Sequence, residues 1–423
     1  MALQRFETFA ALRHRNFRLF FAGQSVSLIG TWMQSMAQSW LVLILTNSAF
    51  YLGLIGALQT LPILLFSFVA GVVADRTNKL RLLFITQSVA MLLALVLGAL
   101  VAEQALRIWV LCVLVFVAGT AFAFDIPVRQ SFIIELVGKE DLPNAIALNS
   151  TMFNATRVAG PATAGFLIAS VGMANCFFLN AASFLAVLLA LILMQLPPAR
   201  PANHLSFGRA WRELFDYVSG KRELQLILGL MTAVSVFAMP YYVLLPLMAR
   251  DILGTGAKGY GWLMASSGLG AFLGGLFLAR RLQRRPPMPS FLGGLLLFLL
   301  GLLGLSLCRN YYLALAALFV SGFGMVTQLS TGNSLLQLNV PDELRGRLMS
   351  LFGLIIVGFA PAGSLFLGTV AHYLGPCLAF AVGSLLAAIS SGILLWRYPE
   401  WRTVGFSDLR PPKPESLPAE VEL

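Results

Sequence analysis

Gly71-Val-Val-Ala-Asp75-Arg76-Thr-Asn-Lys79-Leu-Arg81 is a dense cluster of charges that stands between two long apolar runs. No charged residue occurs from Phe50 to Ala74, and none occurs from Leu82 to Val101. Each run is longer than the roughly 20 residues that a helix needs to cross about 30 Å of hydrocarbon. The cluster is therefore predicted to be a short loop at a membrane surface. A carboxylate beside three cations in such a loop suits a latch between helices.

The composition of the whole chain is that of a membrane protein with many spans. Of its 423 residues, 58% are hydrophobic and 11% are charged, and the mean hydropathy is +0.82. Soluble domains carry about 25% charged residues. The N-terminal segment lacks a short apolar core with a cleavage site, so we expect the first span to act as its own insertion signal. The four cysteines show no metal-ligand spacing, and we expect no metal, no cofactor and no disulfide framework.

Twelve apolar runs are candidate spans of an all-α membrane protein. They begin near Phe17, Phe50, Leu82, Arg107, Ala145, Asn175, Leu224, Ala257, Ser290, Tyr312, Leu348 and Cys377. With a cytoplasmic N-terminus, all but five of the 29 Lys and Arg residues fall on the cytoplasmic side, so the positive-inside rule places both termini there. The net charge of +11 is then a topology signal, and we expect a lipid bilayer rather than nucleic acid as the partner.

The chain divides into two similar halves around its longest internal polar segment. We expect a cytoplasmic segment 1–16, a six-helix bundle 17–196, a linker 197–223, a second bundle 224–398 and a disordered tail 399–423. In the linker, Phe207, Trp211 and Leu214 recur at helical spacing with Phe215 and Val218, which predicts an amphipathic helix on the membrane surface. Elements of the first bundle recur in the second at offsets near 200 residues, as Gly71 does in Gly275.

The charge cluster follows the pattern Gly-x-x-x-Asp-Arg-x-(Gly)-(Arg/Lys)-x-Arg, which resembles the signature loop between helices 2 and 3 of the major facilitator superfamily. Asn78 stands where that family usually has glycine, and asparagine also tolerates the positive φ of such a turn. The segments 125–130 and 154–161 resemble the branch that includes the enterobactin exporter and related multidrug effluxers. The resemblance implies a major facilitator fold of two six-helix bundles, related as parallel repeats. It also implies export across the cytoplasmic membrane, driven by an ion gradient.

The resemblance implies a gating role for the loop. Asp125 is implied to pair with a cation of the loop, with Lys79 the first choice and Arg76 or Arg81 the others. Asp75 is implied to sit at the positive N-terminal end of the eleventh helix, near 345–348. These contacts would lock the cytoplasmic side in the outward-open state. The candidate gating residues are Gly71, Asp75, Arg76, Lys79, Arg81, Asp125 and Arg129.

Arg157 lies near the middle of the fifth candidate span, where a charge costs at least about 2.5 to 3.5 kcal/mol unless it has a partner or faces the bundle interior. One hypothesis is that it lines a cavity and binds an anionic substrate group or perturbs a coupling carboxylate. The other is an ion pair between helices of the first half. Gly160, Pro161 and Gly165 follow and resemble the fifth-helix Gly-Pro motif of antiporters. They predict a bend and a tight seam against a helix of the other half.

No charge stands in the middle of a span of the second half. If protons drive export, we therefore expect the titrating group to be Asp125 or another carboxylate of the first half, such as Glu135, with Arg157 as the other charge at the coupling site.

Polar residues at steps of three and four on the first span predict a stripe that faces a central cavity. Tyrosines on the seventh span and polar residues on the fifth and tenth extend this candidate site, and about half of these residues are expected to bond helices together instead. The candidates are Gln24, Ser27, Thr31, Gln34, Gln38, Asn154, Tyr241, Tyr242, Gln328 and Thr331. Amides, hydroxyls and aromatics with few fixed charges suit large amphipathic cargo.

Other function classes lack their motifs. The chain has no Gly-x-x-x-x-Gly-Lys-Ser/Thr nucleotide loop, and its three histidines, His14, His204 and His372, are isolated, so we expect no pump ATPase and no enzyme. We expect a monomeric exporter of small amphipathic molecules, drug-like compounds or a siderophore, with the proton as coupling ion. An uptake transporter of the same fold and a non-transporting receptor are the alternatives.

Overall fold

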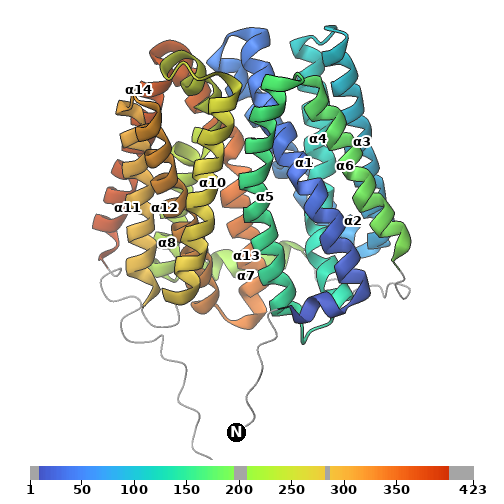
Figure 1. The fold of residues 1–423 in the computed structure, drawn as a ribbon. Helices are drawn as coiled ribbons and strands as arrows, with labels where there is room; N and C mark the ends of the chain where they lie inside the picture. The colour runs from blue at the N-terminus through green and yellow to red at the C-terminus, as the bar shows by residue number, and fades with distance from the viewer. Residues whose placement is uncertain (1–8, 195–206, 282–285, 400–423) are drawn as a thin grey trace, which may run out of the picture.

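Helices are the only regular elements in residues 9–194, 207–281 and 286–399, which the computed structural model describes (Figure 1). The first half contains a short 3-10 helix, η1 (Ala10–Arg13), and six long helices. These are α1 (Arg15–Thr46), α2 (Ala49–Arg76), α3 (Lys79–Ala102), α4 (Ile108–Val137), α5 (Leu142–Ser170) and α6 (Ala174–Leu193).

The second half opens with α7 (Phe207–Ser219) and continues with spans that contain irregular turns. Its seventh span starts as α8 (Arg222–Phe237) and proceeds through η2 (Met239–Leu244), α9 (Leu245–Leu247) and the π-turn η3 (Met248–Ile252). Pro240 and Pro246 lack the N–H that a regular helix needs, which accounts for the change of geometry. The remaining helices are α10 (Gly256–Arg281), α11 (Pro287–Leu307), α12 (Tyr311–Leu338), α13 (Asp342–Gly353), the π-turn η4 (Leu354–Gly358) and α14 (Ala360–Arg397).

The prediction of twelve spans is confirmed for the described residues. Ten helical stretches are long and apolar enough to cross a membrane, and one of them, Leu344–Arg397, has 54 residues. As one continuous helix, this stretch would measure about 80 Å, which is more than twice the thickness of the hydrocarbon layer. It breaks at Gly375, whose φ of 81° is left-handed, and so forms two spans. The twelfth span is α5, which is not one of these ten apolar stretches but packs between α1 and α10.

The two halves meet along two pairs of helices, α2 with α14 and α5 with α10. Figure 1 shows α5 and α10 side by side at the centre of the molecule. Glycines allow the backbones to touch: a Cβ on Gly53 would lie 2.5 Å from the Ser364 carbonyl oxygen, and one on Gly165 would lie 3.2 Å from the Gly261 Cα. Both seams lie toward the end of the molecule where α1 finishes, which we call the distal end; α1 begins at the proximal end.

The linker 197–223 contains α7 at the proximal end of the second half. Leu214 is fully buried, whereas Phe215 is 55% exposed, so the helix is amphipathic. Side-chain hydrogen bonds tie α7 to the second half: for example, Arg347 donates to Glu213 at 2.6 Å, and the Tyr217 hydroxyl donates to the Asn339 carbonyl at 3.2 Å. The side chains of Phe207 and Trp211 lie outside the described residues, as do the linker before α7 and the tail from residue 400.

Candidate functional site

The loop between α2 and α3 is a tight turn closed by Asn78. Asn78 is the N-cap of α3, and its Oδ1 accepts a hydrogen bond from the Arg81 N–H at 3.1 Å. Its φ is −61°, so the expectation of a positive φ is wrong. Asparagine serves here because its side chain caps the helix, not because it tolerates a left-handed backbone.

Lys79 pairs with Glu135 and not with Asp125, the partner that the resemblance implies for it. The Lys79 Nζ donates to Glu135 Oε1 at 2.6 Å. The reason is depth: Lys79 is the first residue of α3, and Glu135 lies two residues from the end of α4. Asp125 lies ten residues earlier on α4, about 15 Å deeper along the helix. A lysine at the helix end therefore meets the carboxylate at the same level.

Asp125 is 2% exposed and is held by four donated hydrogen bonds. Arg129, one turn later on α4, donates to Oδ2 through Nε at 2.8 Å and through Nη2. On α3, the Thr86 hydroxyl donates to Oδ1 at 3.0 Å and the Gln87 amide donates to the same oxygen at 2.8 Å. We call these four residues the Asp125 cluster. It joins α3 to α4 inside the first half.

The remaining candidate gating residues have few described contacts. The side chains of Asp75 and Arg76 lie outside the described residues, and the predicted seat of Asp75 near the eleventh helix stays a prediction. Arg81 is exposed. A Cβ on Gly71 would meet no atom within 4 Å, so the structure shows no close approach that requires glycine there.

Contacts between the halves at the distal end form a group that sequence reasoning missed. The Arg250 guanidinium, from η3, donates both to Asp251 beside it and to Asn47 Oδ1 after α1. Ser48 Oγ lies 3.5 Å from Nδ1 of His372 in α14. We call these five residues the distal latch. Asn47 is the C-cap of α1 and has a left-handed φ of 49°. Its contact with Arg250 arises because the two halves of the fold meet at this end.

Arg157 lies midway along α5, beside three aromatic side chains. It is the sixteenth of 29 residues of α5, and its guanidinium carbon lies 5.9 Å from the centre of the Trp32 ring. Phe153 packs edge-on against Trp32, with ring centres 5.6 Å apart. Tyr242, from the second half, is close enough to Arg157 to interact with it electrostatically. These residues form the Arg157 cluster, and all four keep partial exposure.

The predicted seam on α5 has two sides. Pro161 and Gly165 face α10, where a Cβ on Gly261 would lie 2.6 Å from the Pro161 carbonyl oxygen. A Cβ on Gly160 would instead collide with Trp32 of α1, in the same half. The first glycine thus brings α1 and Trp32 close to α5, and the second brings α5 close to the other half.

Several candidate cavity residues form hydrogen bonds to a neighbouring helix or to the backbone of their own helix. Asn180 of α6 donates to Gln34 Oε1 at 2.7 Å, and the Tyr241 hydroxyl lies 2.6 Å from Ser267 Oγ inside the second half. The side chains of Thr31, Asn154 and Thr331 donate to carbonyls one turn earlier on their own helices. The buried members are Gln24, Ser27, Gln38, Tyr241, Gln328 and Thr331, and of these Gln24 Oε1 and both polar atoms of the Gln328 amide have no hydrogen-bond partner among the described residues.

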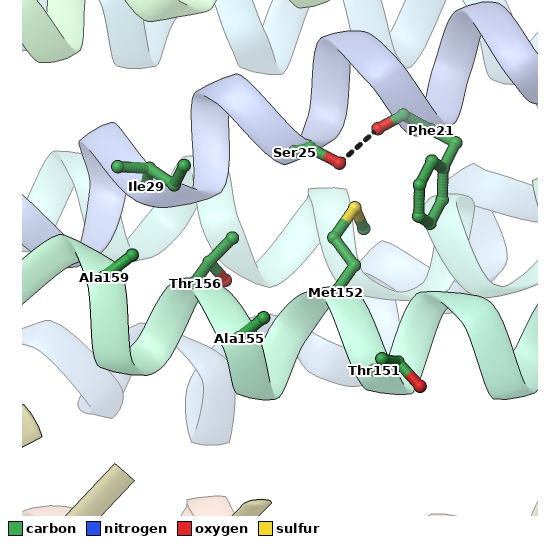
Figure 2. Close-up of a pocket in the computed structure, with 8 residues that line it drawn as sticks. All are labelled: Phe21, Ser25, Ile29, Thr151, Met152, Ala155, Thr156 and Ala159. Carbon is green, nitrogen blue, oxygen red and sulfur yellow. Dashed lines mark hydrogen bonds between the residues drawn. The ribbon is translucent and has the colours of Figure 1, made fainter. Parts of the chain in front are cut away.

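An apolar groove of about 350 Å³ lies between the proximal parts of α1 and α5 (Figure 2). Phe21 and Ile29 line it from α1, and Met152 lines it from α5. Its hydroxyls are turned to their own helices: Ser25 donates to the Phe21 carbonyl at 2.7 Å, as the dashed line in Figure 2 marks. Thr156 donates to the Phe153 carbonyl at 3.0 Å. The groove therefore presents mainly carbon.

Comparison with known proteins agrees with this architecture. The profile of the family described as transmembrane secretion effector matches residues 6–419. The staphyloferrin A transporter of Staphylococcus aureus is 25% identical and aligns over 86% of this chain and 92% of its own length. The enterobactin exporter EntS of Escherichia coli is 26% identical over 90% and 91%, and the multidrug efflux pump Tap of Mycolicibacterium fortuitum is 25% identical over 84% and 89%.

Solved transporters share the fold at low sequence identity. The nucleoside transporter NupG superposes with a TM-score of 0.69 at 13% identity, over 92% of this chain and 99% of that one. A bacterial homolog of the human lysosomal transporter Spinster, inward-facing and unoccupied, gives 0.69 at 15% identity over 92% and 96%. Because the family profile covers nearly the whole chain, this multi-pass membrane protein belongs to the transmembrane secretion effector family of major facilitator transporters and is not an enzyme.

Proposed function

We propose that this protein exports amphipathic small molecules from the cytoplasm by alternating access, as a proton antiporter. Relatives that span nearly the whole chain support the direction, since two of them are named as an exporter and as an efflux pump. The partly exposed aromatic and polar side chains midway along the helices support an amphipathic cargo.

The observation that carries the proposal is that the Arg157 cluster takes side chains from both halves. Trp32 of α1 and Arg157 of α5 belong to the first half, and Tyr242 of η2 belongs to the second. A molecule bound there contacts both bundles, so its binding free energy can differ between two arrangements of the halves. That difference is what alternating access requires.

The contacts between the halves support a state closed at the distal end. The distal latch and the two glycine seams all join the halves there. With the termini in the cytoplasm, as the positive-inside rule predicts, the distal end faces outward and this state is closed to the outside. Lys79 and Asp125 then have their partners within the first half, and the loop contacts implied for the outward-open state form only after the proximal end closes.

The proposed coupling carboxylate is Asp125. Its carboxylate is buried and shares its oxygens between Arg129 and two neutral donors. A shift of α4 against α3 separates this carboxylate from Thr86 and Gln87 of α3, so its hydrogen-bond partners can differ between the two states of the transporter. Glu135, with Lys79 at the helix end, is the second candidate carboxylate.

The test is retention of fluorescent amphiphiles by cells that express the chain, with and without an uncoupler. We expect expressing cells to retain at least one compound less than cells carrying the empty vector, and the uncoupler to abolish the difference. Asp125→Asn is expected to remove the difference as well. Equal retention across a broad panel contradicts export, and higher retention in expressing cells indicates uptake.

A further inference from the structure

Arg157 is a cation at mid-membrane depth with no anionic partner among the described residues. Within this part of the chain, no carboxylate forms an ion pair with it and no acceptor takes a hydrogen bond from it. Two other cations of the first half are paired, Arg129 with Asp125 and Lys79 with Glu135. The expected alternative of an ion pair between helices therefore does not hold for Arg157 in the described structure.

The contact with Trp32 does not replace an anion. A cation over an aromatic face contributes about 0.5–1 kcal/mol at exposed sites and about 2 kcal/mol when it is desolvated. An arginine in the middle of a span costs at least about 2.5 to 3.5 kcal/mol. The partial exposure of Arg157 reduces this cost. The N–H groups of its guanidinium still have no oxygen acceptor among the described residues.

The aromatic side chains beside Arg157 make a surface for a ring. Phe153 precedes Arg157 by four residues, on the same face of α5, and is 45% exposed. It packs edge-on against Trp32, so the two rings form one corner next to the guanidinium. Tyr242, which belongs to the other half, interacts electrostatically with Arg157 and is 38% exposed. A flat apolar group can pack against this corner while an anionic oxygen reaches the cation.

We infer that the Arg157 cluster binds the anionic head of an aromatic acid, and that the preferred cargo is an amphipathic aryl carboxylate or phenolate. Guanidinium binds a carboxylate through two parallel hydrogen bonds, which a lysine ammonium cannot reproduce. The same unpaired charge repels cationic amphiphiles. This inference rests on the proposed function, because it names the class of molecule that the same site carries.

Binding to purified protein in lipid nanodiscs tests the inference without requiring transport. Three probes differ only in the head group: 2-naphthoate, neutral 2-naphthamide and cationic 2-naphthylmethylammonium. We expect calorimetry to show 2-naphthoate binding at least about tenfold more tightly than the other two. In Arg157→Gln, 2-naphthoate should fall to the affinity of 2-naphthamide, whose own binding stays the same. Arg157→Lys should recover part of the difference.

The matched control is Arg107→Gln, which removes an exposed arginine outside the spans and should leave all three affinities unchanged. Thermal unfolding of each variant checks that it is folded. Equal binding of the three probes to the wild-type protein, no binding of any, or wild-type affinity for 2-naphthoate in Arg157→Gln overturns the inference. Export that persists while the preference is absent refutes this inference alone, whereas charge-selective binding without export refutes the proposed function.

Discussion

At the scale of single residues, two arginines of the first half have opposite surroundings. Arg129 lies one turn after Asp125 on α4 and binds it, in place of the loop cation that the resemblance implies. Arg157 has aromatic neighbours from two other helices, and no spacing in the sequence reveals them. Only the arrangement of the helices around Arg157 distinguishes the two hypotheses for it.

Asp125→Asn is expected to destabilise the protein because it leaves Arg129 without its counter-charge. Breaking a fully buried ion pair costs roughly 3–5 kcal/mol, and the loss is smaller here because the Arg129 side chain keeps 19% exposure. The melting temperature of the purified protein should fall by several degrees. Asp251→Asn removes a carboxylate from an exposed pair and should change it little. Equal effects of the two substitutions would contradict a structural role for the Asp125 cluster.

At the scale of helices, periodicity predicted which faces are polar but not what each face meets. The polar stripe of α1 spans Gln24 to Gln38, and α1 packs against both α5 and α6. Gln34 accepts a hydrogen bond from Asn180 of α6, whereas Thr31 is exposed. In hydrocarbon a polar side chain serves equally as helix contact or as cavity lining, so its sequence position does not distinguish the two.

Gly53→Ala tests the seam between α2 and α14. The added Cβ would lie 2.5 Å from the Ser364 carbonyl oxygen, so the helices must separate and the distal closure weakens. We expect export to fall several-fold while the protein still inserts and folds. Gly293→Ala in α11 places the same methyl group where no atom lies within 4 Å and should leave export unchanged. A Gly53→Ala protein that transports like the wild type would show that the seam is not needed.

At the scale of the whole molecule, the distal latch and the seams hold the two bundles together at one end. Ser48 and His372 lie 324 residues apart in the sequence and come together across the boundary between the halves. Alternating access requires such contacts to break in each cycle.

A reversible cross-link between Ser48→Cys and His372→Cys is expected to stop transport by holding the distal end closed. The protein would carry replacements of its four native cysteines, and a short thiosulfonate linker would join the new pair. Transport should return after reduction, and each single-cysteine variant treated in the same way should keep it. Undiminished transport by the cross-linked protein would show that the distal end need not open.

The sequence was enough for the number of spans and the position of the charged turn. Membrane thickness sets the length of a span, and helix geometry sets the neighbours of each residue within it. The partner of Lys79, the aromatic surroundings of Arg157 and the contact of Asn47 with Arg250 came from the folded chain alone. Those contacts depend on the depth and rotation of one helix relative to its neighbour. Apolar helix surfaces are similar to one another and allow many such arrangements, and the packing of all twelve spans together selects one of them.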